Sequence, residues 1–265
     1  MIKMIFSDLD GTLIPPQYGK LPEEIPELIR QLKEKGVDFC AASGRQFPCM
    51  YKMFEPMSKD MYFIANNGGD IHYHGETLRA VTMDRDDLDE LLDDIMALPG
   101  VEIECAGLKS GYTTTKNEPY LKVLREVVGY IEENIPDMHN PPEPFVKVAM
   151  LQYGKTEFDP EIVRKFQEKY GESYDITASG NGWVDFMMKD VGKGNAVRFM
   201  KEKLNLGRDE IAVFGDNEND LSMLLEADRS YCMPHSPENV KSHSRFVAKD
   251  IVYELRKILT EVSNV

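Results

Sequence analysis

Residues 5–12, which read IFSDLDGT, decide the fold. They close an apolar run over residues 2–9 that favours a buried β-strand, and the turn formers Asp10 and Gly11 follow that run. Between residues 21 and 36, apolar side chains recur at helical spacing up to a glycine that interrupts them. The order strand, loop, helix indicates the first unit of a sheet whose strands are joined by helices.

Three further apolar runs are each followed by polar or glycine-containing residues. They span residues 37–42, 61–65 and 211–214. Strands that alternate with helices predict a parallel sheet, so we expect an α/β fold with a Rossmann-like core. Ligands bind at the carboxyl ends of such strands, and the residues that follow each run are therefore the first candidates for a site.

The middle of the chain predicts a separate α/β unit. Its pattern favours a helix over 118–134 and strands over 145–151 and 183–188. The stretch between Ser43 and Lys193 is far longer than one strand-helix repeat needs, so this unit must be inserted between core strands.

We therefore predict two domains. The catalytic core comprises residues 1–82 plus 186–265, and an inserted α/β cap comprises residues 83–185.

Composition excludes several classes of function. A net charge of −15 argues against binding to nucleic-acid backbones or anionic membranes, because both need a basic surface. The four cysteines form no CxxC pair, so neither a zinc site nor a disulfide framework is indicated. No window reaches the ~18 apolar residues of a membrane span, and the first residues do not read as a signal peptide. We expect a cytoplasmic protein, and the sequence indicates no protein partner.

Polar groups stand at four places where strands or helices of the core meet loops. They are Asp8 and Asp10 after the first strand, Ser43 after the second, Lys193 before a late helix, and GDNEND at 215–220. Taken singly, each has a purely structural explanation as a turn residue, a helix cap or a surface lysine. Together they supply carboxylates, a hydroxyl and an amine suited to one phosphoryl-transfer site.

This set of motifs resembles the haloacid dehalogenase superfamily, and specifically its Cof-like hydrolases. DLDGT at 8–12, ASGR at 42–45, GKGNA at 192–196 and GDNEND at 215–220 match the four family motifs in order, and NNGG at 66–69 extends the match. The resemblance implies that Asp8 is the nucleophile and Asp10 the general acid and base. The other roles that it implies are phosphate binding by Ser43, Gly44, Lys193 and Asn219, magnesium binding by Asp8, Asp10 and Asp216, and support behind the metal by Asp220.

Elementary chemistry agrees with these roles. A phosphate monoester is a dianion that repels a carboxylate nucleophile, and Mg²⁺ together with Lys193 would neutralise that charge before Asp8 approaches phosphorus. A covalent phosphoaspartate would divide the hydrolysis into two in-line displacements. We therefore expect a Mg²⁺-dependent phosphatase that acts on a small phosphorylated metabolite, with sugar phosphates as the leading class.

Two other functions use part of the same chemistry. A phosphomutase or phosphotransferase would share Asp8 and Asp10 and differ in what reaches the phosphoenzyme. A phospho-acceptor regulatory module would use an aspartate and magnesium to switch a partner. The complete set with Ser43 and Lys193, together with an inserted unit, favours the phosphatase.

Three residues are candidates for contacts with the substrate. Strand alternation places Lys147 on the face opposite the expected core, and it pairs Trp183 with Asp185 on one face. Lys147 could contact a charged or hydroxylated leaving group, with an exposed surface lysine as the alternative. Trp183 could receive a ring, although packing explains it as well. Arg45 could steer phosphate or form an ordinary ion pair.

Overall fold

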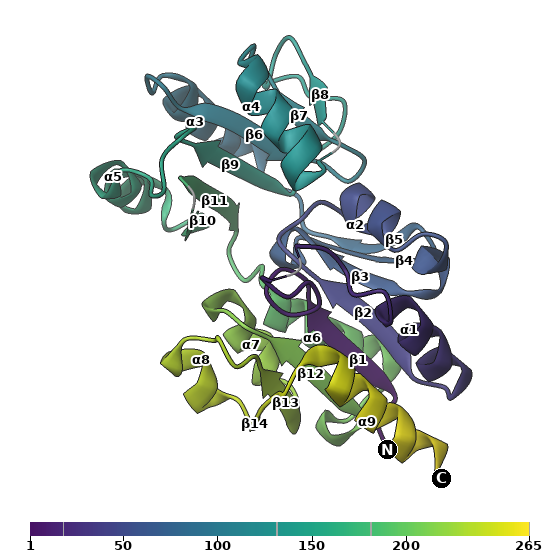
Figure 1. Ribbon diagram of the computed structural model, residues 1–265. Coiled ribbons are helices and arrows are strands. Elements are labelled where there is room, and N and C mark those ends of the chain that lie inside the picture. The colour runs from purple at the N-terminus through teal and green to yellow at the C-terminus, as the bar shows by residue number, and fades with distance from the viewer. Residues whose placement is uncertain (18, 131, 181, 265) are drawn as a thin grey trace. The chain divides into compact units, whose positions relative to one another are not determined.

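The computed structural model describes residues 1–17, 19–130, 132–180 and 182–264. The chain divides into two compact units (Figure 1). Unit 1 comprises Met1–Gly44, Met50–Leu78 and Gly192–Val265, and unit 2 comprises Arg45–Cys49 and Arg79–Val191. The assignment of residues 83–185 as a domain in its own right stays a prediction.

Unit 1 is built on an eight-stranded sheet with the order β14-β13-β12-β1-β2-β3-β4-β5 (Figure 1). Its strands are β1 Met4–Asp8, β2 Asp38–Ala42, β3 Tyr62–Ala65, β4 Asp70–Tyr73, β5 Glu76–Ala80, β12 Ile211–Gly215, β13 Arg229–Cys232 and β14 Phe246–Val247. The pairs from β14 to β3 are parallel, whereas β3 and β4 are antiparallel. The predicted α/β fold with a parallel-sheet core is confirmed.

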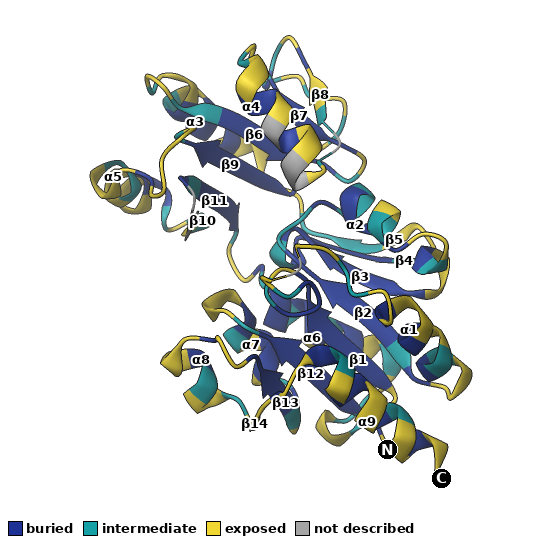
Figure 2. Cartoon of the chain, in the orientation of Figure 1, coloured by how far each residue is buried: buried dark blue, intermediate teal, exposed yellow. Residues whose placement is uncertain are grey.

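Helices cover the strands of this sheet. They are α1 Ile25–Glu34, α6 Lys193–Leu204, α7 Leu221–Leu224, α8 Glu238–His243 and α9 Ile251–Ser263, with 3₁₀ turns at Met57–Asp60, Asn66–Gly68, Arg208–Glu210 and Glu218–Asp220. A further helix, α2 Phe47–Met53, begins in unit 2 and enters unit 1 at Met50. All five residues of β1 are buried, and Figure 2 shows the central strands in the colour of buried residues. Phe6, Val197 and Val213 belong to one apolar cluster, so α6 is packed on the centre of the sheet and its first residue is brought to the strand ends.

Unit 2 contains a six-stranded sheet with the order β10-β11-β9-β6-β7-β8. Its strands are β6 Glu102–Ala106, β7 Gly111–Thr113, β8 Glu132–Asn134, β9 Lys147–Leu151, β10 Tyr174–Gly180 and β11 Trp183–Met188, and its helices are α3 Arg85–Met96, α4 Glu118–Val123, α5 Pro160–Tyr170 and a π-helical turn at Leu124–Val128. Leu91 of α3 and Phe166 of α5 share an apolar core with Val148 of β9. Both helices therefore cover the face of the sheet on which the side chain of Val148 lies.

The helix predicted over 118–134 is wrong in its second half. The helical segment ends at Val128, and β8 occupies Glu132–Asn134, while residue 131 lies outside the described residues. Gly129 adopts a φ of 77°, a left-handed conformation that ends helices. The apolar spacing before this glycine is helical, and the prediction extended it too far.

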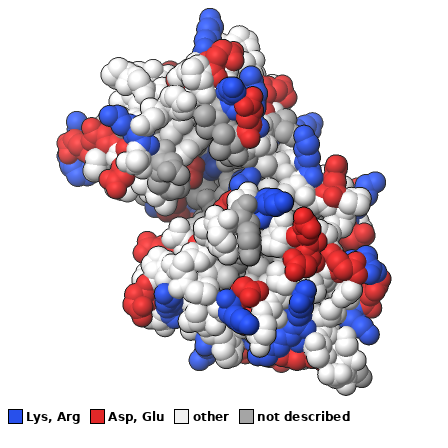
Figure 3. Space-filling view, in the orientation of Figure 1, with Lys and Arg blue, Asp and Glu red and all other residues white. Residues whose placement is uncertain are grey.

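Acidic and basic side chains are interspersed on the face that Figure 3 shows. Among the described residues, no helix combines the length and the apolar character needed to cross a membrane.

Candidate active site

Asp8 and Lys193 form the centre of the candidate site in unit 1. Asp8 is the last residue of β1 and is 6% exposed, and Lys193 begins α6 with 1% exposure. The Lys193 ammonium donates hydrogen bonds to Oδ1 of Asp8 at 2.6 Å and to Oδ1 of Asp220 at 2.7 Å. One buried cation is thereby shared between two buried carboxylates.

The loop after β12 supplies two more carboxylates. Oδ2 of Asp220 accepts the backbone N–H of Asp216 at 2.9 Å and that of Asn217 at 3.1 Å, so Asp220 holds the loop closed. Asp216 accepts a hydrogen bond from Oγ1 of Thr12 at 3.1 Å, and Nε2 of His235 lies 3.3 Å from its other oxygen. The loop therefore aims Asp216 toward the segment that follows β1.

Gly11 allows this close approach. Its φ is 99°, a conformation that L side chains rarely adopt, and a Cβ placed there would lie 2.2 Å from Oδ2 of Asp216. The glycine of DLDGT thus has a local steric reason within the candidate site.

The arrangement fits a divalent cation. Asp8, Asp216 and Asp220 each offer an oxygen, and these oxygens all lie within 4.8 Å of one another. Oδ2 of Asp8 is buried and has no hydrogen-bond partner among the described residues. The oxygens of Asp220 already accept from Lys193 and two backbone N–H groups, so Asp8 and Asp216 are the carboxylates best placed to hold an ion. Carboxylate oxygens suit hard cations such as Mg²⁺.

The electrostatics of the site point the same way. Burial raises the pKa of Asp8 well above its ordinary value, the charge of Asp220 raises it further, and Lys193 opposes both effects. Burial and the charge of Asp220 also raise the pKa of Asp216. Three acidic groups around one ammonium leave negative charge that a bound cation would compensate.

The other predicted residues of the core lie at strand ends or in the loops after them. Asp10 is exposed and forms a backbone bridge with Ile14, and its carboxylate lies outside the group of three. Ser43 is buried after β2, and its carbonyl oxygen accepts the N–H of Asn67 at 2.9 Å. Asn219 donates to the side chain of Asn67 at 3.4 Å. Gly44 also lies against Asn67, because an added Cβ would be 3.1 Å from the amide of that residue.

The substrate candidates of unit 2 have clear surroundings. Lys147 is 3% exposed and its ammonium lies 3.3 Å from Oδ1 of Asp185, so the alternative of an exposed lysine is wrong. Burial alone would lower the pKa of Lys147, but the charge of Asp185 raises it above its ordinary value. Trp183 packs beside Tyr120, with the ring centroids 6.3 Å apart. Nη1 of Arg45 lies 4.0 Å from Sγ of Cys49.

Sequence reasoning missed several residues of the site. Thr12 belongs to the DLDGT motif, yet its hydroxyl was given no role. His235 follows β13, and inspection of the residues after every parallel strand would have found it. Asn67 lies in the NNGG motif, to which no chemistry was assigned.

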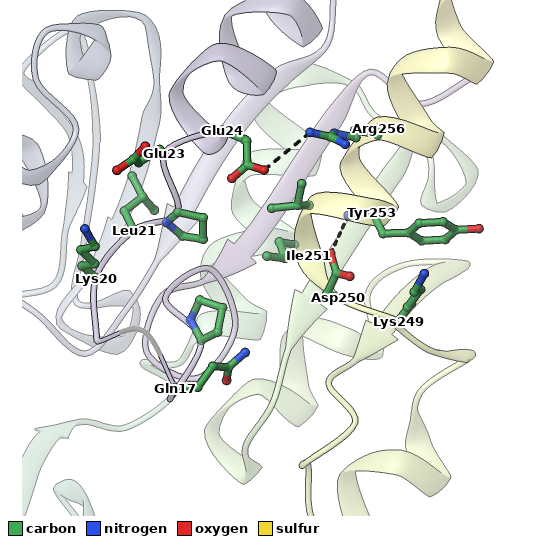
Figure 4. Close-up of a pocket in the computed structure, with 13 residues that line it drawn as sticks. Gln17, Lys20, Leu21, Glu23, Glu24, Lys249, Asp250, Ile251, Tyr253 and Arg256 are labelled. Carbon is green, nitrogen blue, oxygen red and sulfur yellow. Dashed lines mark hydrogen bonds and ion pairs between the residues drawn. The ribbon is translucent and has the colours of Figure 1, made fainter.

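A separate cavity of about 660 Å³ in unit 1 contains none of the predicted site residues. Residues from 15–24 and 249–256 line it, and Figure 4 shows several of these side chains. Arg256 pairs with Glu24 at 3.6 Å, and Asp250 caps α9 through the N–H of Tyr253 at 2.7 Å. Both contacts therefore have a local structural explanation.

Comparisons with known proteins identify the family of the chain. A model of the haloacid dehalogenase-like hydrolases matches residues 5–251. A 5-amino-6-(5-phospho-D-ribitylamino)uracil phosphatase of Escherichia coli strain K12 is 27% identical over 247 residues, which cover 93% of this chain and 90% of that protein. A phosphatase of Bacillus subtilis strain 168 is 24% identical, with 91% and 92% covered.

A solved structure shows the same fold. It is a haloacid dehalogenase-like hydrolase from Bacteroides thetaiotaomicron, with a TM-score of 0.85 and 18% identity, and the match covers 97% of this chain and 100% of that one.

Proposed function

Because this chain belongs to the haloacid dehalogenase-like hydrolases, in the Cof-like branch that its motifs predicted, we propose that it hydrolyses a small phosphorylated metabolite through a phosphoaspartate, an acyl phosphate formed on Asp8. The chain is a phosphatase, an enzyme that hydrolyses phosphoric monoesters. The observation that carries the proposal is the pair of Asp8 and Lys193, in which a buried carboxylate keeps one oxygen without a partner among the described residues.

The proposed reaction has two displacements at phosphorus. In the first, an oxygen of Asp8 forms a bond to phosphorus while the bond to the leaving oxygen breaks, and Asp10 donates a proton to that oxygen. In the second, water forms the new bond to phosphorus, Asp10 takes its proton, and the bond to Asp8 breaks. Ser43, Gly44, Lys193 and Asn219 would hold the phosphate oxygens in both steps.

The proposed cofactor is Mg²⁺, held by Asp8, Asp216 and the backbone carbonyl of Asp10. When bound, it would neutralise charge on the phosphate. The convergence of carboxylate oxygens and the raised pKa values of Asp8 and Asp216 support this assignment. Asp220 has a supporting role, since both of its oxygens are occupied by Lys193 and the loop.

For the substrate we propose a sugar or polyol phosphate. The relative from Escherichia coli is named for a phosphorylated ribityl compound, in which the leaving group carries hydroxyl groups. Lys147 and Trp183 are the residues of unit 2 proposed to contact the leaving group, and Arg45 is proposed to steer phosphate. A small metabolite of this kind is the expected partner of a cytoplasmic enzyme.

The test is release of inorganic phosphate from a panel of sugar, polyol and nucleotide phosphates, with and without Mg²⁺. We expect release that requires Mg²⁺ and that falls about 10³-fold or more in Asp8→Asn. Asp10→Ala should lose about 10² to 10⁴ in turnover while inorganic phosphate still inhibits competitively at its usual concentration.

Three results would contradict the proposal. Equal phosphate release by Asp8→Asn and the wild type would exclude Asp8 as the nucleophile. Loss of phosphate inhibition together with turnover in Asp10→Ala would show that Asp10 binds phosphate and does not transfer the proton. An isomerised product in place of free phosphate would identify a mutase.

A further inference from the structure

The NNGG loop, residues 66–69, has an unusual backbone that the proposed reaction does not explain. Asn66 and Asn67 have φ values of 47° and 53°, and Gly68 has a φ of 102°. Two successive residues other than glycine in the left-handed region are uncommon, and such conformations persist where the surroundings enforce them. Oδ1 of Asn66 is also buried without a hydrogen-bond partner among the described residues.

This loop contacts three of the four motif segments in unit 1. The N–H of Asn67 donates to the carbonyl of Ser43 at 2.9 Å, and its side-chain oxygen accepts from Asn219 at 3.4 Å. A Cβ on Gly68 would lie 2.5 Å from the carbonyl oxygen of Gly192, the residue before Lys193. The NNGG loop therefore lies against the residues proposed to bind phosphate.

A chain of polar side chains, buried from Asn66 to His72 and ending at the exposed Thr77, contacts the loop. Nδ2 of Asn66 donates to Oδ1 of Asp70 at 2.8 Å, Nε2 of His72 lies 2.6 Å from Oδ2 of Asp70, and Oγ1 of Thr77 lies 3.3 Å from Nδ1 of His72. Asn66 and Asp70 are fully buried, and His72 is 1% exposed. A His72 tautomer with its proton on Nε2 donates to Asp70 and accepts from Thr77, so both ring nitrogens are used.

We propose that the NNGG loop is a positioning element for the phosphate site. Asn67 sets the separation between the Ser43 turn and the Asn219 loop, and Gly68 lets Gly192 and Lys193 approach. The Asn66–Asp70–His72 chain holds Asn66 and Asn67 in the left-handed conformation that these contacts need. Asn66, Asn67 and Asp70 are positioning residues, because they act through Ser43, Asn219 and Lys193. The inference rests on the proposed function of those three residues.

Asn67→Gly is the principal test variant. Glycine tolerates a positive φ, so the backbone can keep its conformation while the contact with Asn219 is lost. Asn205→Gly is a matched control, because Asn205 has a φ of 51° at the C-terminal end of α6, whereas Lys193 begins that helix. Both variants thus replace an asparagine that has a positive φ with glycine.

The first measurement is calorimetric binding of inorganic phosphate to the full chain in the presence of Mg²⁺. We expect about 10- to 100-fold weaker phosphate binding in Asn67→Gly and unchanged binding in Asn205→Gly. With an active substrate, KM should rise by a similar factor and kcat should fall less, since the chemical groups of Asp8 and Asp10 are intact. Thermal unfolding of both variants shows whether they fold alike.

Rescue separates positioning from general support of the fold. Asp70→Asn keeps a side-chain oxygen that can accept from Asn66, whereas Asp70→Ala removes it. We therefore expect a smaller loss of phosphate affinity in Asp70→Asn than in Asp70→Ala. Unchanged phosphate affinity in Asn67→Gly would overturn the proposal, as would equal losses in the Asn205→Gly control. A wild type that binds phosphate but releases none from any ester would refute the proposed function and leave this test valid.

Discussion

At the scale of single residues, Gly11 shows how one missing side chain shapes the candidate site. Its position beside Asp216 leaves no room for a methyl group, and its φ of 99° adds strain for any L side chain. A side chain at residue 11 fits only if the backbone there or Asp216 moves. Either movement displaces a proposed metal ligand, because residue 11 adjoins Asp10. A residue without functional groups can therefore shape the proposed cation site.

The first prediction concerns Gly11→Ala. We expect the Mg²⁺ concentration for half-maximal phosphatase activity to rise about 10- to 100-fold, since displaced partners of metal ligands cost affinity by that factor. Magnesium titration of phosphate release measures the effect.

Gly36→Ala is the matched control for strain. Gly36 has a φ of 77°, and an added Cβ there would meet nothing within 4 Å. This variant should lose some stability and keep its magnesium requirement. Equal magnesium titrations for Gly11→Ala and the wild type would show that the loop after β12 can move without harm.

At the scale of secondary structure elements, the sheet of unit 2 carries a buried charge that costs stability. Glu104 of β6 and Asp185 of β11 both lie opposite Ala149 of β9, and Gln46 donates to Glu104. Burial raises the pKa of Glu104 to about 7, although Lys147 lowers it in part. Oε2 of Glu104 is buried without a hydrogen-bond partner among the described residues.

The consequence is a pH-dependent stability. Below pH 4.5 Glu104 is protonated in both the folded and unfolded states. Between pH 4.5 and about 7 the folded state keeps a proton that the unfolded state has lost, so stability falls as pH rises through this window. Above that window the loss is complete.

Glu104→Gln should remove this loss. The quantity to compare is the free energy of unfolding of the variant minus that of the wild type. We expect this difference to be roughly 2 to 3 kcal/mol more favourable to the variant at pH 8 than at pH 4.5. Urea unfolding at both pH values measures the difference. A stability difference that is the same at both pH values would contradict the raised pKa of Glu104.

The order of the elements could be predicted from sequence, because apolar runs and turn residues are local signals. The strand at Ile211–Gly215 and the helix that begins at Lys193 follow from such patterns. The sequence alone did not show that Gly129 ends the helical segment, because a glycine can also occur inside a helix. The contacts of Asn67 with Ser43 and Asn219 were also hidden, since they join segments far apart in the sequence.

The residues of the candidate site could be grouped from sequence for a different reason. The ends of parallel strands meet at one edge of a sheet, so Asp8, Ser43 and Asp216 could be grouped before their positions were known. Which oxygens of the carboxylates stay available depends on hydrogen bonds such as those of Asp220, and sequence does not record these. The exposure of Asp10 was likewise beyond local pattern.

At the scale of the whole molecule, the two units have separate apolar cores. Phe6 and Val213 belong to the cluster of unit 1, whereas Leu91 and Val148 belong to that of unit 2. The proposed metal ligands all lie in unit 1. A ligand that binds there stabilises the unit that holds it.

Magnesium should therefore act unevenly along the chain. At a hundredfold excess over Kd we expect about 2.7 kcal/mol of added stability in unit 1. Hydrogen exchange should show slower exchange in segments of unit 1, such as β1 and β12, and little change in unit 2. Asp216→Asn should reduce the gain. An equal gain in that variant would place the binding of magnesium elsewhere.

The pairing of β1 with β12 also bears on how the protein is made. Lys193 lies 185 residues after Asp8, and the ribosome adds about 5 to 20 residues per second, so a nascent chain carries Asp8 for roughly 10 to 40 s before its lysine exists. During translation the whole of Arg79–Val191 emerges before β12 is available to β1. A chain whose synthesis stops before residue 193 thus contains the proposed nucleophile but lacks Lys193, the amine proposed to neutralise the charge of a phosphate beside it.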